Sequence, residues 1–447
     1  MFENMVKQPA AERLKADIEN NILAPSMLFA GPPASGKGTT ALEIGRAFSC
    51  ETPSAPWNCR CHACAYHRAL SHDDLVVTGP RPFSAEIAAS RAALLRDTAS
   101  ASSRTLFWRS VRKLLLRFSP VLLADDPKIT KLNGLLEAVT DTMEELNRSF
   151  ERADEPEKIT KLCDAALKHT QKLEAEGIAD TVPVLHVRNA AYWLRIAPLG
   201  RRKLLVIENA DRMQDAARNS LLKILEEPPE TSAIILCSAK PEALLPTILS
   251  RLRRYGFARR GEAADAEVVR RVFKETPDAV PAHDRAESGI TAYLDKFLPV
   301  PKDVLYPVAA FFWASMAADI AARPGRASPE MTAIGTRCAE IARNAGLGEP
   351  AAGIKALCVA TLASAGNFAV RGTFTVFLGL LCSTLSEALS VLGSSSPPLS
   401  RSLCAAYRRV LLKCAGEAKA AVDIYRQTPQ LALERLSLSL LNNLGTL

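Results

Sequence analysis

The sequence predicts an α/β fold built around a parallel sheet that is buried on both faces. Residues 204–207 and 232–237 are short, continuous apolar runs, which is typical of such strands. Between them lies a helical segment that begins at Asp215 and ends before Pro228. A third apolar run, residues 27–30, is followed by a glycine-rich loop and a further helical segment. This alternation of strands and helices is typical of parallel α/β folds.

Each further element of this core has its own signal. The helix between the two strands has Asp215 as its expected N-terminal cap and its apolar residues on one face. These apolar residues are Ala217, Leu221, Leu222 and Leu225. Residues 246–251 are expected to form a short helix that ends in an exposed arginine, Arg251. Residues 76–77 and 253–257 are expected to belong to two more strands of the same sheet.

The composition is that of a soluble globular protein with a mild basic excess. The chain has 447 residues, enough for two or three domains, with 48% hydrophobic and 23% charged residues. Its net charge of +8 favours a polyanionic partner over a membrane. We find neither a signal-peptide pattern nor an uninterrupted apolar run of about 18 residues. We therefore expect a cytoplasmic protein that does not enter a membrane.

The glycine-rich loop after residues 27–30 has the pattern of a phosphate-binding loop. It consists of Gly31, Pro32, Pro33, Ala34, Ser35, Gly36, Lys37, Gly38 and Thr39. Backbone N–H groups of such a loop point inward, and the following helix N-terminus adds positive potential. Lys37 would reach the outer phosphates of ATP. Gly38 stands where a hydroxyl normally contacts Mg²⁺, with Thr39 one place late, so binding is favoured more than catalysis. A glycine turn that no longer binds nucleotide is the alternative.

Four of the eleven cysteines lie close together in the sequence: Cys50, Cys59, Cys61 and Cys64. Four thiolates at such spacing can close a tetrahedral Zn²⁺ site. His62 or His67 could substitute for one of them as a ligand. A reduced cysteine cluster without metal is the alternative. A secreted disulfide scaffold is disfavoured, because the other cysteines are scattered through a long chain.

Several stretches resemble the clamp-loader AAA+ proteins of bacterial DNA polymerase III. They are LFAGPPASGKGTT, the four-cysteine segment, IENADRM, NSLLKILEEPP and LLPTILSR. The family usually has glycine at the position of Ala34, and two residues between the second and third cysteines where only Arg60 stands here. The resemblance implies an AAA+ P-loop domain with a zinc module, followed by a small helical lid and an all-α C-terminal collar. The expected boundaries are 1–258 for the P-loop domain, about 50–64 for the zinc module, 259–300 for the lid and 301–447 for the collar.

The family pattern breaks between about residues 81 and 180. Residues 104–118 form an expected amphipathic helix, and the apolar spacing of residues 129–150 and 159–173 predicts two more helices. We therefore expect a helical insertion in the P-loop domain. The polar side of its first helix is basic, with Arg109, Arg112, Lys113 and Arg117. This basic face could meet DNA or another subunit, and a solvated outer face is the simpler alternative.

The resemblance also implies roles for residues beyond the loop. ATP hydrolysis in this family needs an Asp–Glu pair after the strand that ends here at Ile207, and these positions hold Glu208 and Asn209. An amide cannot act as a base, so we expect weak or absent ATP hydrolysis. Arg251 matches the arginine finger, which neutralises charge on the γ-phosphate in a neighbouring subunit. Ser238 matches the sensor position, and a hydroxyl that caps a strand end is the alternative.

Weak hydrolytic residues beside a retained finger are what the delta-prime type of clamp-loader subunit shows. The resemblance thus implies a subunit that helps other clamp-loader subunits to load the sliding clamp onto primed DNA. A gamma/tau-like clamp-loader ATPase is the second interpretation. A small-molecule kinase, suggested by the word GKGT, is disfavoured because the chain lacks an obvious acceptor lid.

Overall fold

The computed structural model describes residues 1–276, 289–323, 329–348, 353–365, 370–394, 399–423 and 427–444. The chain divides into two compact units. One is made of residues 1–280 and 287–294, and the other of residues 281–286 and 295–447.

The first unit is built on a five-stranded parallel sheet with the strand order β2-β3-β4-β1-β5. Its strands are β1 (Ser26–Ala30), β2 (Leu75–Thr78), β3 (Lys203–Ile207), β4 (Ser232–Ser238) and β5 (Arg253–Gly256). Every residue of β1 to β4 is buried, whereas the edge strand β5 is largely exposed. The predicted α/β fold with a parallel, doubly covered sheet is therefore confirmed. Because all strands run the same way, the residues that follow them meet at one edge of the sheet.

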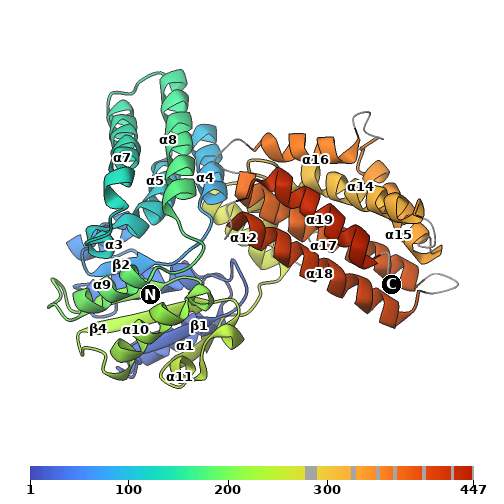
Figure 1. Cartoon of the computed structure of the whole chain (residues 1–447). Helices are drawn as coiled ribbons and strands as arrows, with labels where there is room; N and C mark the ends of the chain where they lie inside the picture. Colours follow the sequence, from blue (N-terminus) through green and yellow to red (C-terminus); the bar gives the residue numbers. More distant parts are fainter. Residues whose placement is uncertain are drawn as a thin grey trace. The chain divides into compact units, whose positions relative to one another are not determined.

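Helices cover both faces of the sheet (Figure 1). Phe29 of β1 packs into a core with α1 (Pro9–Glu19), α2 (Lys37–Ser49) and α3 (His62–Ala69). Its neighbour Leu28 points to the opposite core. The helices of that second core are α9 (Val184–Leu194), α10 (Asp215–Glu226) and α11 (Pro246–Leu249). Alternate strand residues thus belong to two apolar layers, one on each face of the sheet, as a sheet covered on both faces requires.

Two details of α10 differ from the prediction. The cap position is occupied by Gln214, and Asp215 is the first helical residue, where its carboxylate accepts a hydrogen bond from Arg218 at 3.1 Å. Leu222 is only half-buried, and Ile224 takes its place on the buried face. The cap was therefore predicted one residue too far along the chain, an error typical of helix boundaries.

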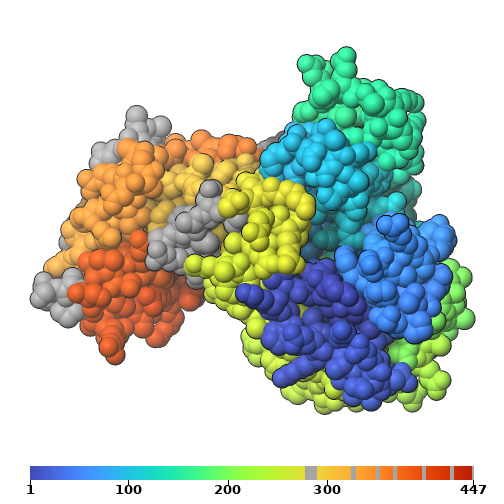
Figure 2. Space-filling model, turned by 180° about the vertical axis from the view of Figure 1, so that it is seen from behind, coloured from blue at the N-terminus to red at the C-terminus, as the bar shows by residue number. Residues whose placement is uncertain are grey.

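The segment that was expected to be an insertion is helical. It contains α4 (Ser84–Arg96), α5 (Ala101–Leu115), a 3₁₀ turn (Leu116–Phe118), α6 (Pro120–Leu123), α7 (Ile129–Glu151) and α8 (Pro156–Gly177). We call residues 84–177 the helical appendage. Helices α7 and α8 pack side by side and project away from the sheet, and the same projection appears in green from behind (Figures 1 and 2). Apolar residues of the appendage, such as Phe107 and Leu146, form a core of their own.

Two further helices follow β5 in the first unit, α12 (Glu262–Phe273) and α13 (Gly289–Asp295). The rings of Phe273 and Tyr293 pack with their centroids 5.0 Å apart. Arg96 of α4 donates a hydrogen bond of 2.7 Å to the carbonyl oxygen of Phe273. These helices fall in the segment expected to be a lid, of which residues 277–288 lie outside the described residues.

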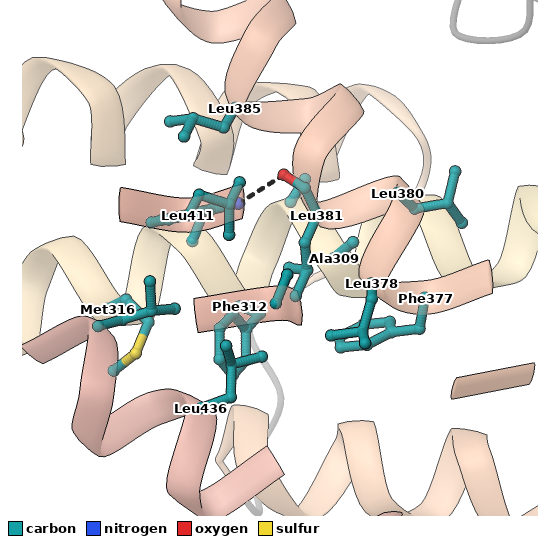
Figure 3. Close-up of a cluster of buried hydrophobic side chains, with 14 of the residues drawn as sticks. Ala309, Phe312, Met316, Phe377, Leu378, Leu380, Leu381, Leu385, Leu411 and Leu436 are labelled. Atoms are coloured by element: carbon teal, nitrogen blue, oxygen red, sulfur yellow. Dashed lines mark hydrogen bonds between the residues drawn. The ribbon is translucent and has the colours of Figure 1, made fainter. Parts of the chain in front are cut away.

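The second unit is helical throughout its described residues. Its helices are α14 (Lys302–Ala321), α15 (Pro329–Asn344), α16 (Ile354–Ala363), α17 (Val370–Gly393), α18 (Arg401–Asp423) and α19 (Pro429–Leu444). By length and composition, α14 and α17 could each cross a membrane. Both supply the core of this unit, where Phe312, Met316 and Leu381 converge with Leu436 (Figure 3). Within this unit, 61% of the apolar window of α14 and 44% of that of α17 are buried.

Candidate nucleotide site and cysteine cluster

The phosphate loop joins β1 to α2 at the carboxyl edge of the sheet. Gly36 has a φ of 96°, a left-handed conformation that favours glycine. A Cβ at Gly31 would lie 2.3 Å from the carbonyl oxygen of Phe257, so the loop needs glycine there too. The Lys37 ammonium donates hydrogen bonds to the carbonyl oxygens of Gly31 at 2.7 Å and Pro32 at 2.6 Å. Burial lowers the pKa of Lys37, while nearby acidic groups oppose that shift.

Arg260 supports the same loop from beyond the sheet. Ala34 stands at a position with a left-handed φ of 55°, where the glycine usual in the family would be unstrained. Its carbonyl oxygen accepts a hydrogen bond of 2.8 Å from Arg260, whose Nε also donates to the carbonyl oxygen of Val6 at 2.9 Å. No pattern in the sequence singles Arg260 out, because it is one of several arginines after β5.

Glu208, the first residue after β3, is neutralised by arginines. Arg117 Nη2 forms an ion pair with Glu208 Oε2, and Arg81 Nε lies 3.7 Å from the same oxygen. Arg117 also donates from Nε to the carbonyl oxygen of Gly79 at 3.1 Å, and only 4% of its side chain is exposed. Burial alone would raise the pKa of Glu208, but Arg117, Arg81 and nearby Lys113 outweigh it and hold that pKa below its ordinary value.

A second carboxylate and an aromatic ring complete this charged cluster. Glu86 of α4 pairs with both Arg81 and Lys113. Burial opposes its ionisation, yet Lys113 and Arg81 lower the pKa of Glu86 to about 2. The guanidinium carbons of Arg81 and Arg117 lie 4.6 and 5.3 Å from the centroid of the buried Phe83 ring. Three cations thus face two carboxylates, and the cluster ties the appendage to the end of β3.

This arrangement corrects one expectation from the sequence. Arg117 and Lys113 were expected on a basic outer face together with Arg109 and Arg112. Both instead point inward, toward Glu208 and Glu86. Helical periodicity identifies the apolar face of a segment, but it cannot show which polar residues find partners elsewhere in the fold.

Gly38 leaves room for this position of Glu208. A Cβ at Gly38 would lie 2.6 Å from Glu208 Oε1, so a serine or threonine there would press on the carboxylate. The next residue, Thr39, is exposed. The hydroxyl and the free carboxylate that normally hold Mg²⁺ beside a phosphate loop are therefore both missing. The residues present do not fit the magnesium site that the resemblance implies.

The backbone conformation and the side-chain hydrogen bond of Asn209 both fix its position after β3. It has a φ of 49°, and its amide Nδ2 donates a hydrogen bond of 2.6 Å to the carbonyl oxygen of Pro80. The resemblance implies a catalytic glutamate at this position. An amide held by the backbone can neither take a proton from water nor move freely toward the loop.

Ser238 connects the end of β4 to an acidic residue of the site. Its hydroxyl donates a hydrogen bond of 2.6 Å to Asp211 Oδ1 and accepts one of 2.9 Å from the backbone N–H of Lys240. The side chain thus caps the strand end, and it also orients the carboxylate of Asp211. Asp211 in turn acts electrostatically on Lys37 of the phosphate loop.

Arg251 lies on the surface, and its ion-pair and hydrogen-bond partners are residues outside the phosphate loop of this chain. It forms an ion pair of 2.8 Å with Glu226 at the end of α10, and it donates a hydrogen bond of 2.7 Å to the carbonyl oxygen of Thr247. About a third of the side chain is exposed. These two contacts hold the guanidinium at the C-terminal end of α11.

The four clustered cysteines converge in space. Their sulfur atoms all lie within 4.8 Å of one another, and the sulfurs of Cys50 and Cys59 are 3.6 Å apart. A tetrahedral zinc site with Zn–S bonds of about 2.3 Å needs sulfur–sulfur separations of roughly 3.8 Å, so this set fits a metal ion. The N–H of Cys61 and the Thr52 hydroxyl lower the pKa of Cys59 to about 6, which favours the thiolate that a metal requires.

The neighbouring histidines do not join this group. The metal-ligating set contains the four cysteines alone among the described residues. His67 instead pairs with the Ser49 hydroxyl at 2.9 Å and stacks on His72. Arg46 donates a hydrogen bond of 2.9 Å to the sulfur of Cys64 and is itself paired with buried Glu43. Arg46 favours the Cys64 thiolate from outside the cluster, but burial outweighs it and raises the pKa of Cys64, as it also raises that of Cys50.

Comparison with known proteins identifies the family. The sequence profile of the family described as "DNA polymerase III, delta subunit" matches residues 6–109 and 137–260, just over half of the chain. The chain belongs to this DNA polymerase III clamp-loader family. The match resumes inside α7, so it covers more of the appendage than the break at residues 81–180 suggested. Arg117 lies in the stretch between the two matched segments.

Individual relatives are similar over shorter stretches. The delta' subunit of Pseudomonas aeruginosa is 37% identical over 106 residues, which are 24% of this chain and 32% of the relative. The delta' subunit of Escherichia coli is 37% identical over 93 residues, 21% of this chain and 28% of the relative. The gamma/tau subunit of Mycobacterium tuberculosis is 36% identical over 81 residues, 18% of this chain and 13% of the relative. The chain thus matches a third or less of each relative's length.

The Arg117–Glu208 pair predicts a measurable loss of stability. Arg117→Gln leaves Glu208 buried without its main counter-charge, so the free energy of unfolding should fall by about 3 kcal/mol at neutral pH. Arg112→Gln, five residues earlier in the chain and without an ion pair among the described residues, should change it by less than about 0.5 kcal/mol. Urea unfolding followed by circular dichroism measures both.

The pH dependence of that loss follows from the direction of the Glu208 shift. Because the folded-state pKa of Glu208 lies below its unfolded value of about 4.3, the pair stabilises the protein above that pH. The contribution is lost as the pH falls through the folded-state pKa. The difference between wild type and Arg117→Gln should therefore shrink in acid. Equal stability of Arg117→Gln and Arg112→Gln at pH 7 would contradict this account of the cluster.

Proposed function

We propose that this chain is a delta-prime-like subunit of the bacterial DNA polymerase III clamp loader. In this role it helps the other clamp-loader subunits to load the sliding clamp onto primed DNA. It supplies Arg251 to the ATP site of a neighbouring subunit and has weak or no ATP hydrolysis of its own. The helices of residues 301–447 are the collar through which it joins the other subunits, and the complex works in the cytoplasm.

The observation that carries this proposal is the contrast between the chain's two candidate catalytic regions. In its own site, Glu208 is neutralised by Arg117, and Asn209 replaces the expected base. At the surface, Arg251 keeps a positive guanidinium on a short helix, held by Glu226. An arginine finger needs no nucleotide in its own subunit, so the second region can function while the first does not.

A gamma/tau-like ATPase is the second candidate, favoured by the match to the Mycobacterium tuberculosis gamma/tau subunit. The phosphate loop keeps Lys37 and the glycines at positions 31 and 36, so we propose that ATP binds in either case. The two candidates differ in the fate of the bound ATP. Without the hydroxyl at Gly38 and with Glu208 paired, bound ATP has no magnesium site of the family's kind, and its turnover is not supported.

The role of Arg251 predicts a loss of ATP turnover in a site that this chain does not contain. Arg251→Ala should leave folding, metal content and complex assembly intact, because the side chain is on the surface. In the reconstituted clamp loader, it should lower clamp- and DNA-stimulated ATP turnover. Arginine fingers contribute on the order of 10³-fold or more in related NTPases, and one affected site among several lowers the total by that site's share.

The matched control is Arg254→Ala, which removes an exposed arginine three residues away on β5. It should leave turnover unchanged. If the complex with Arg251→Ala hydrolyses ATP as fast as the complex with Arg254→Ala, then Arg251 is only a surface charge at a helix end, and the proposed role in trans is wrong.

We also propose that Cys50, Cys59, Cys61 and Cys64 hold one structural Zn²⁺. Support comes from the convergence of four sulfurs and from the Arg46 donor to Cys64. The ion would fix the loop between α2 and α3, where the chain has little other secondary structure.

Metal analysis of protein prepared without chelator should give about one zinc per chain. Cys61→Ser should lower this content strongly, because three thiolates bind zinc more weakly than four. Cys404→Ser, which changes a half-buried thiol in the second unit, should leave it unchanged. Wild-type protein that carries no metal would show that the cluster is a group of free thiols.

A further inference from the structure

A basic groove with two aromatic side chains lies between α3 and the appendage. It has a volume of about 610 Å³ and opens to solvent. Helix α3 forms one wall, α5 forms another, and the C-terminal end of α7 forms the third. The residues that give the groove its chemistry are Arg68, Arg104, Trp108, Arg109, Arg112 and Phe150. None of them belongs to the phosphate loop or to the cysteine cluster.

The groove is a built feature of α5 rather than a chance arrangement of surface side chains. Phe107 and Val111 anchor one face of this helix in the core of the appendage. Arg104, Trp108 and Arg112 follow at intervals of four residues on another face, so they lie in a row along the groove. In Figure 2 the surface of residues 50–70, in mid-blue, adjoins that of α4 and α5, in cyan.

Three of the four groove arginines are oriented by backbone oxygens. Arg68 donates to the carbonyl oxygens of Cys59 and Trp57, Arg104 to that of Ala99 at 2.7 Å, and Arg109 to that of Arg68. Among the described residues, none of the four groove arginines forms an ion pair with a carboxylate. Carbonyl partners fix a guanidinium group without neutralising it, so the groove is a site of concentrated positive charge.

Two of these arginines lie beside the aromatic rings. The guanidinium carbon of Arg112 is 5.8 Å from the centroid of Trp108, and that of Arg104 is 4.9 Å from the centroid of Phe150. None of the residues that line the groove is acidic, and Asn147 at its edge donates a hydrogen bond of 3.0 Å to Glu151. Half-buried aromatic planes interleaved with cations are the surface on which unpaired bases stack while phosphates meet arginine.

We propose that this groove binds single-stranded nucleic acid. Phosphate groups contact Arg104 and Arg112, and a base stacks on Trp108. Paired bases in a duplex cannot present their faces to Trp108, and the acidic residues of a peptide carry negative charge without an aromatic base to stack there. The proposal is independent of the clamp-loader function above, because the groove uses none of the residues on which that function rests.

The test is the affinity of the full chain for a fluorescent oligothymidylate about 16 nucleotides long, the upper end of known single-strand site sizes. Fluorescence anisotropy should show binding by the wild type at low salt. Trp108→Ala should weaken it about tenfold or more, since stacking contributes on the order of 1–3 kcal/mol per base. Trp108→Phe, which keeps an aromatic plane, should retain most of the affinity.

The salt dependence of binding distinguishes the contribution of the arginines from that of the Trp108 ring. Arg104→Gln with Arg112→Gln should reduce the slope of log K against log salt by about 1.4, because each phosphate contact contributes about 0.7 for single strands. Trp108→Ala should leave that slope unchanged. The matched control is Lys161→Gln with Lys168→Gln, which removes two exposed charges of α8 outside the groove and should lower the affinity much less.

Circular dichroism and urea unfolding verify that each variant folds, and the arginine variant tests the groove even if Trp108→Ala does not fold. Absence of binding by the wild type would overturn the proposal. Equal affinity of the wild type, Trp108→Ala and the double arginine variant would overturn it as well. If a duplex binds more tightly than the single strand, the groove is a duplex site. If oligoglutamate displaces the oligothymidylate equally well from the wild type and from Trp108→Ala, the groove is a site for acidic peptides.

Discussion

The ion pair between Arg117 and Glu208 joins the helical appendage to the parallel sheet of the first unit. Glu208 stands at the carboxyl end of β3, at the edge of the sheet where the phosphate loop also lies. Arg117 stands in the appendage, 91 residues away in sequence. Burial makes the pair interdependent, because removal of either charge leaves the other buried and unpaired. The appendage therefore does more than extend the fold, since it supplies the counter-charge for a central acidic residue.

The same pair depends on the residues around it. With Glu208 turned to the arginines, the space beside it is available only because residue 38 is glycine. Asn209, next in the chain, bonds to the backbone of Pro80. Together these contacts leave Glu208 paired with arginine side chains and Asn209 bonded to the backbone at the edge of the sheet where the phosphate loop lies.

The parts of this structure that could be predicted were those with local signals. Apolar runs identified the buried strands, the glycine pattern identified the phosphate loop, and close spacing identified the cysteine cluster. Helix α4 had no such signal, because its alanine-rich sequence shows no distinct apolar stripe. The partner of Arg117 could not be predicted either, since helical periodicity places a residue on a face but does not identify a contact 91 residues away. Arg260 was missed for the same reason.

The measurement that tests the central claim most directly is ATP turnover by the purified chain itself. It should be made with the chain alone and with added clamp and primed DNA, beside a Lys37→Ala variant that disables the phosphate loop. The account predicts that wild type and Lys37→Ala show the same background turnover under every condition. DNA-stimulated turnover by the wild type that Lys37→Ala abolishes would contradict it, and would make the chain an active clamp-loader ATPase.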